Sequence, residues 1–133
     1  MDSEVIRLTV GSRFVTDLTR TVDRFCDGKG DGLVNIFVPH ATAGVALIET
    51  GSGTETDLEK ILARMLPIDD IYLHRHGSFG HGRDHVMPAF ISPSLSVPVL
   101  AGRMQLGTWQ SVVLVDPNGD NPDRQVRLSF LSG

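Results

Sequence analysis

Apolar and polar residues alternate near both ends of the chain, which predicts half-buried β-strands. Over positions 4–10, Ile6, Leu8 and Val10 alternate with polar or charged neighbours. A period of two places all three side chains on one face of a strand. The same alternation, together with short runs of β-branched and other apolar residues, predicts strands over residues 4–10, 33–38, 44–48, 95–99, 104–115 and 126–130, the fifth interrupted at residues 107–110.

Two segments show helical spacing instead. Residues 17–26 carry apolar side chains three and four positions apart and are followed by glycines that end the helix. Residues 58–65 follow the i, i+3, i+4, i+7 pattern of an amphipathic helix. Thr54 is suited to the N-cap of this second helix, with Asp57 near a capping-box position, and Pro67 ends it.

The order of these elements predicts one α+β domain spanning residues 1–133. Antiparallel sheets of about six to seven strands would stack in a β-sandwich-like arrangement, with two main helices packed against them. Residues 72–86 fit neither pattern and are predicted to form a glycine-rich loop. A chain of 133 residues is long enough to bury one hydrophobic core.

Composition narrows the classes of function. A formal net charge of -4 argues against a broad nucleic-acid-binding face, which requires basic residues. The single cysteine, Cys26, can form no intramolecular disulfide, and its place in a predicted helix favours a buried apolar role. The first residues lack the features of a signal peptide, and no apolar run approaches the roughly 18 residues of a membrane span. We therefore expect a cytoplasmic protein with neither nucleic-acid nor membrane partners.

All five histidines fall between positions 40 and 85, and four of them lie within twelve residues. Imidazole is the commonest metal ligand of proteins and also titrates near neutral pH. His74 and His76 would leave the same face of a strand. His85 could fold back onto that face, and His40, at the end of another predicted strand, could complete a three-histidine metal set. The alternative is a solvated loop without chemistry, which is favoured for His76 and His81.

Five further residues could contact a substrate. Glu49 follows an apolar run, where partial burial would suit its carboxylate to proton transfer, although exposure at a strand end is the alternative. Thr42, Thr108 and Gln110 lie close to glycines that would let a ligand approach the backbone. Arg124 could bind an anionic substrate, and a solvated strand face explains it equally well.

Several of these residues occur in blocks that resemble the YjbQ-like family, also called the secondary thiamine-phosphate synthase family. The blocks cover nearly the whole chain and occur in order: Pro39-His40-Ala41-Thr42-Ala43-Gly44-Val45, Glu49, Asp57, Tyr72-Leu73-His74, Asp84-His85, Leu106-Gly107-Thr108-Trp109-Gln110 and an arginine-containing final strand. Either of the two longest blocks alone would be weak evidence for the family, but the two together are a specific signal.

The resemblance implies a compact α+β fold with a β-sandwich-like core, a homotrimer, and a polar site near the subunit contacts. It implies a divalent metal, expected to be zinc, on some of the histidines. The activity attached to the family name joins an aminopyrimidine pyrophosphate to a thiazole phosphate, and it is expected here as a side activity. The residues implied to line the site are His40, Thr42, Glu49, His74, Asp84, His85, Thr108 and Gln110.

Two segments depart from the pattern of the family. Residues 81–85, His-Gly-Arg-Asp-His, stand where many relatives have Asn-Ala-Asp-Ala-His. Residues 116–124 stand where relatives have an acidic-Gly-Pro-Arg turn before the last strand. The resemblance therefore assigns no role to Arg124. The chain is therefore expected to belong to a subgroup with its own substrate.

Two hypotheses follow. In the first, the protein is a metal-assisted enzyme that acts on a phosphorylated small molecule, and the metal ligands are His40, His74 and His85. Its catalytic groups would be Glu49, Asp84, Thr108 and Gln110, with Thr42 and Arg124 in a cofactor-binding role. In the second, the same pocket belongs to a non-catalytic metal-binding or small-molecule-binding module.

Overall fold

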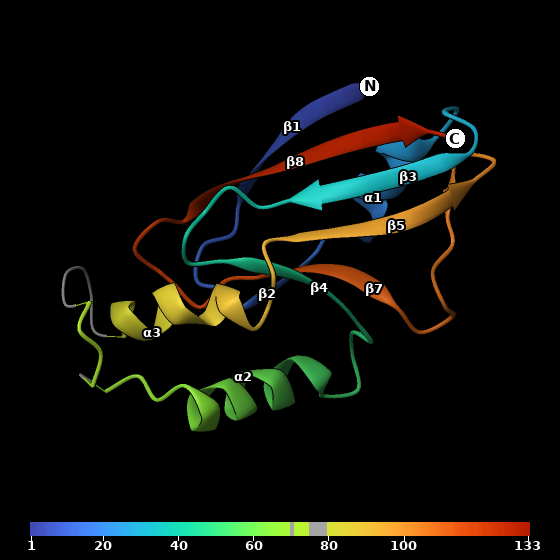
Figure 1. Ribbon diagram of the computed structural model, residues 1–133. Helices are drawn as coiled ribbons and strands as arrows, with labels where there is room; N and C mark the ends of the chain where they lie inside the picture. The colour runs from blue at the N-terminus through green and yellow to red at the C-terminus, as the bar shows by residue number, and fades with distance from the viewer. Residues whose placement is uncertain (70, 75–79) are drawn as a thin grey trace.

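The computed structural model describes residues 1–69, 71–74 and 80–133, which form two antiparallel sheets and their covering helices (Figure 1). The elements follow in the order β1 (Asp2–Thr9), β2 (Val15–Asp17), α1 (Thr19–Cys26), β3 (Gly32–Phe37), β4 (Gly44–Ile48), α2 (Thr54–Met65), α3 (His81–Val86), a 3-10 turn (Met87–Ala89), β5 (Ser94–Leu100), β6 (Arg103–Met104), β7 (Ser111–Val115) and β8 (Asp123–Ser132). The predicted α+β class with antiparallel sheets is confirmed.

The larger sheet has the strand order β1-β8-β3-β5-β6. The long strand β8 pairs with β1 on one side and with β3 on the other, so the two ends of the chain meet in one sheet. Val126, Leu128 and Phe130 of β8 are buried, whereas the residues between them face outward. The alternation read from the sequence therefore marks the inner face of this sheet.

The smaller sheet has the order β2-β7-β4 and lies between the larger sheet and α2 (Figure 1). Its central strand β7 is buried on both faces. Val112 and Leu114 belong to the core between the sheets, whereas Val113 and Val115 pack in a second core with Leu62 of α2. Double-sided burial explains why β7 is a continuous apolar run rather than an alternating one.

Helix α1 contributes Val22, Phe25 and Cys26 to the core between the sheets. The Cys26 thiol is fully buried, and this burial, followed by the nearby Asp23 carboxylate, raises its pKa to about 11. Cys26 therefore has the buried apolar role that its position in the sequence indicated.

The interruption predicted at residues 107–110 is present, but the two parts of the predicted strand over residues 104–115 do not belong to one strand. Met104 ends β6 in the larger sheet, and Ser111 begins β7 in the smaller one. Between them the Gly107 N–H donates to Gln110 Oε1 at 2.8 Å, and the Gln110 N–H donates to the Gly107 carbonyl at 3.0 Å. These bonds close a turn that carries the chain from one sheet to the other.

The helices also differ from the prediction. The described residues contain three α-helices rather than two, because His81–Val86, predicted as loop, forms α3. Thr54 is the first residue of α2 and not its N-cap, which is Gly53 at φ 88°. No side chain caps this helix, and the carboxylate of Glu55 accepts the N–H of Gly51, two residues before the N-cap, at 3.0 Å. Strand β2, three residues long, was not predicted. Among the helices described, none combines the length and apolar character that a membrane crossing requires.

Candidate functional site

Three histidine rings meet where α3 faces the segment that precedes it. His81 and His85 are four residues apart on α3 and so share one face of the helix. The ring of His74 lies 4.0 Å from that of His85 and 5.1 Å from that of His81, centroid to centroid. One ligand nitrogen from each of the three lies within 4.8 Å of the others. His76, which the sequence paired with His74, lies outside the described residues.

Two glycines allow α3 to pack closely against the segment that carries His74. Gly80 precedes α3 with φ 87°, a backbone conformation that other residues rarely adopt. Gly82 is buried against the preceding segment. A Cβ at residue 82 would lie 2.7 Å from the His74 carbonyl oxygen and 2.8 Å from the Cβ of Tyr72. Gly80 and Gly82 of the predicted loop therefore serve helix packing.

Asn118, buried in the loop after β7, connects the histidines to a set of charged groups. Its Nδ2 lies 3.0 Å from His81 Nδ1 and donates to Asp84 Oδ2 at 3.1 Å. The other oxygen of Asp84 accepts from Arg83 Nε at 2.7 Å. Asp120 Oδ2 lies 3.2 Å from the same Nδ1 of His81. Both oxygens of Asp84 thus bind protein groups, and Asp84 is linked to His81 of the cluster through Asn118.

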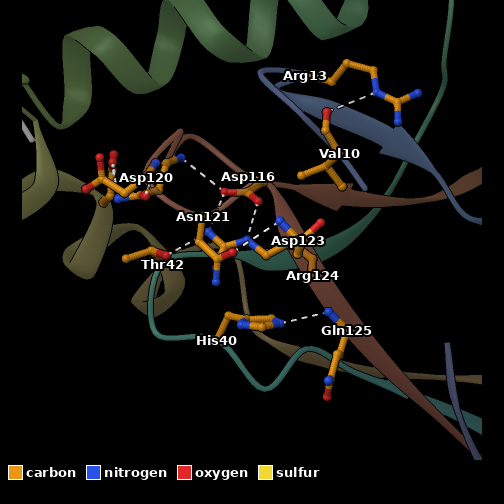
Figure 2. A network of polar contacts seen from close by, with 12 residues as sticks. Val10, Arg13, His40, Thr42, Asp116, Asp120, Asn121, Asp123, Arg124 and Gln125 are labelled. Carbon is orange, nitrogen blue, oxygen red and sulfur yellow. Dashed lines mark hydrogen bonds and ion pairs between the residues drawn. The ribbon is translucent and has the colours of Figure 1, made fainter. Parts of the chain in front are cut away.

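A buried ion pair lies on the other side of Asn118. Arg124 donates from Nε and from one terminal nitrogen to the two oxygens of Asp116, at 2.6 and 2.9 Å, and the same terminal nitrogen donates to Thr42 Oγ1 at 3.0 Å (Figure 2). The Asn118 N–H donates to Asp116 Oδ1 at 3.1 Å. The side chains of Arg124 and Asp116 are only 3% and 2% exposed. Arg124 is therefore neither on a solvated strand face nor available as a freely exposed cation.

His40 lies apart from the three-histidine cluster. Its Nε2 accepts the Gln125 N–H of β8 at 2.9 Å (Figure 2). Burial, and after it the nearby Arg124 guanidinium, lowers the pKa of His40 from its ordinary value of 6.5. Because Nε2 accepts, the neutral ring carries its proton on Nδ1. His40 and Arg124, together with Arg7 and Asn121, line a pocket of about 380 Å³ on this side of the loop.

Within this chain, three predicted catalytic residues lie far from the histidines. In the antiparallel pairing of β4 with β7, Gly44 faces Val115 and Ile48 faces Ser111. Glu49 therefore lies at the end of the smaller sheet opposite to Thr42 and the loop after β7, and the turn containing Thr108 and Gln110 is at the same far end. All three side chains are exposed. The expected partial burial of Glu49 is wrong, because Glu49 follows the last residue of β4 at an open sheet edge.

The structure thus groups the predicted residues differently from the sequence. Of the predicted metal set, His74 and His85 come together, and His81 takes the place expected of His40. No group of three metal-binding side chains within the described ranges includes His40. The four-residue spacing of His81 and His85 was visible in the sequence, but it carries information only if the segment is helical. Asn118, Asp116 and Asp120 had no local signal, since polar residues are ordinary in loops.

Sequence comparisons connect the chain to one family. Residues 4–133 match the profile described as UPF0047 protein YjbQ-like. The UPF0047 protein Rv2556c of Mycobacterium tuberculosis is 58% identical over 133 residues, which is 100% of both chains. A UPF0047 protein of Methanothermobacter thermautotrophicus is 31% identical over 116 residues, covering 85% of this chain and 79% of that one.

Solved structures show the same fold. The hypothetical protein APE1520 from Aeropyrum pernix K1 superposes with a TM-score of 0.87 at 28% identity, and the match covers 100% of both chains. A YbjQ-like protein of unknown function from Sulfolobus solfataricus P2 gives a TM-score of 0.90 at 22% identity, over 99% of this chain and 97% of that one. At that identity the second match bears on the fold alone.

Proposed function

Because the chain belongs to the UPF0047 YjbQ-like family, we propose that it binds a divalent metal, zinc, at His74, His81 and His85 and acts on a phosphorylated small molecule. The observation that carries the proposal is the convergence of three imidazoles whose ligand nitrogens lie within 4.8 Å of one another. Imidazole is a preferred ligand of zinc, and three protein ligands leave a fourth position for water or substrate.

The residues present fit this ion. Zinc–nitrogen bonds of about 2.0–2.1 Å in a tetrahedral site separate the nitrogens by about 3.3 Å. The Nε2 atoms of His81 and His85 are 2.8 Å apart, at hydrogen-bond distance. They would therefore have to separate by a few tenths of an ångström, which a small ring rotation provides. When bound, the metal would supply a Lewis acid that polarises a phosphoryl oxygen.

The pocket beside His40 supports a phosphorylated ligand. The exposed Arg7 lines its wall and offers a cation, whereas Arg124 lines it while paired with Asp116. His40 and Asn121 add hydrogen-bonding groups. Asp116 and Asn118 connect this wall to the histidine cluster through 2.9–3.1 Å hydrogen bonds. In this proposal, the pocket binds and orients the anionic end of the substrate.

The family resemblance adds two further parts to the proposal: a thiamine-phosphate synthase-like side activity, and a homotrimer with sites near the subunit contacts. The position of Glu49, Thr108 and Gln110 bears on both. These residues are exposed at the far end of the smaller sheet, so a second copy of the chain would have to present them to the histidine cluster. Glu49 would then transfer a proton, and the other two would hold the substrate.

The same separation favours a second candidate function. Within one chain, Glu49, the predicted proton-transfer group, lies far from the histidines, as it would in a non-catalytic metal-binding or ligand-binding module. Turnover of a phosphorylated substrate that is lost in Glu49→Gln would support the enzyme. Ligand binding without turnover, in a sample shown to be oligomeric, would support the module.

The experiment that tests the metal site is elemental analysis of the purified protein. We expect near-stoichiometric zinc in the wild type, and loss of zinc in folded His81→Ala and His85→Ala. His40→Ala is the matched control, because it removes an imidazole outside the cluster and should keep the metal. Circular dichroism confirms folding in each case. Zinc absent from folded wild type after growth with zinc, or zinc lost only in His40→Ala, would overturn the proposed site.

A further inference from the structure

We propose that Asp120 is the positioning residue that makes His81 a metal ligand, an inference that rests on the metal site proposed above. A single atom, Nδ1 of His81, lies 3.2 Å from Asp120 Oδ2 and 3.0 Å from Asn118 Nδ2. The first neighbour is an acceptor and the second is a donor. In a neutral ring, Nδ1 can form a hydrogen bond with only one of them.

The choice between these neighbours decides which nitrogen of His81 can bind a metal. If Nδ1 carries the proton, it donates to Asp120, and Nε2 keeps the lone pair that a metal requires. If Nδ1 is bare, it accepts from Asn118, and the proton sits on Nε2. That proton then points along the 2.8 Å contact to Nε2 of His85 and occupies the place of the metal.

Charge favours the arrangement that binds metal. A hydrogen bond to an ionised carboxylate is roughly twice as strong as one between neutral groups, so Asp120 outweighs the amide of Asn118. The side-chain amide of Asn118 keeps a partner whichever nitrogen of His81 carries the proton, because Asn118 Nδ2 also donates to Asp84 Oδ2 at 3.1 Å. A carboxylate behind a ligating imidazole also makes that ligand more basic.

Asp120 is held in place although it is exposed. Its N–H donates to Asn118 Oδ1 at 2.9 Å, and the Asn118 N–H donates in turn to Asp116, which is paired with Arg124. The buried ion pair therefore positions the loop, and the carboxylate of Asp120 is not needed for that task. Asp120→Asn should fold normally, and it replaces the carboxylate that faces His81 with an amide.

The test compares Asp120→Asn with Asp123→Asn. Both remove one negative charge from the same polar segment, but Asp123 is exposed at the start of β8, where it accepts a long 3.4 Å bond from Thr9 Oγ1. Zinc affinity is measured by chelator competition on protein whose folding is confirmed by circular dichroism. We expect Asp120→Asn to weaken zinc binding by about 10–100-fold. Asp123→Asn should change it by less than about threefold, since exposed charges are screened by salt.

A second readout separates positioning from charge alone. Long-range ¹H–¹⁵N correlation spectra of the metal-free protein, recorded at about pH 8, where ordinary imidazole is neutral, report which nitrogen carries the proton. His81 should carry it on Nδ1 in the wild type and on Nε2 in Asp120→Asn, whose new amide can donate to Nδ1. Equal zinc affinity in the two variants, or an unchanged proton position, would overturn this inference and leave the metal site standing. A wild type that binds no zinc would overturn the site itself, and this inference with it.

Discussion

Replacing Arg124 with Met should strongly destabilise the protein, because it leaves the carboxylate of Asp116 buried without its cation. The two side chains are 3% and 2% exposed and share two hydrogen bonds of 2.6 and 2.9 Å. Met retains much of the apolar stem of Arg and so keeps most of its packing. Removing one member of a buried pair costs about 3–5 kcal/mol, a large part of the ~5–15 kcal/mol by which domains are usually stable.

The assay is urea denaturation followed by circular dichroism, on metal-free protein at pH 7. Arg127→Met is the matched control, because Arg127 lies on the same strand but is exposed and donates to the exposed Ser3 hydroxyl at 2.8 Å. We expect the control to change the free energy of unfolding by less than about 0.5 kcal/mol.

A double-mutant cycle identifies the cause. Asp116→Asn keeps an acceptor for the Asn118 N–H but removes the charge. The Asp116→Asn/Arg124→Met double variant should therefore be more stable than the two single effects predict, by at least about 1 kcal/mol. A cost below about 1 kcal/mol for Arg124→Met, or additive single effects, would refute the view that a desolvated charge pair organises this loop.

Two further predictions concern His40 and Gly82. Because the folded pKa of His40 is lowered from 6.5 by burial and by the Arg124 guanidinium, the unfolded chain takes up the proton first, and wild-type stability should fall as the pH drops below about 6.5. In His40→Gln this contribution, at most about 1.4 kcal/mol per pH unit, should be absent from urea titrations, and an unchanged pH dependence would contradict it. Gly82→Ala should force His74 away from α3, since the added Cβ would lie 2.7 Å from the His74 carbonyl oxygen. Its zinc affinity should therefore drop, whereas Gly119→Ala, with no atom within 4 Å of the added Cβ, should bind zinc as the wild type does.

The strands that follow local periodicity were predictable. Strands β1 and β8 alternate because one face of the larger sheet is buried, and the run at residues 44–48 matches β4. Helix α2 follows from its apolar stripe. These features need only information carried by neighbouring residues, because the period of a strand or helix repeats within a few positions.

Elements that depend on distant partners were not predictable in the same way. Strand β2 is short and is specified by its pairing with β7. Helix α3 has six residues, with one glycine inside it and another at its N-cap, and its place is set by the close contact of Gly82 with the segment before it. The interruption at residues 107–110 was predicted, but the membership of β6 and β7 in different sheets was not.

The sequence by itself determined the fold class, the family and the residue types available for chemistry. It also marked His74 and His85 as members of a possible metal set. Tertiary structure alone decided that His81 joins them while His40 turns to β8, and that Glu49 lies at the opposite end of the sheet. Local sequence encodes the period of each element, but the meeting of side chains depends on helix packing and on a loop held by the buried pair of Asp116 and Arg124.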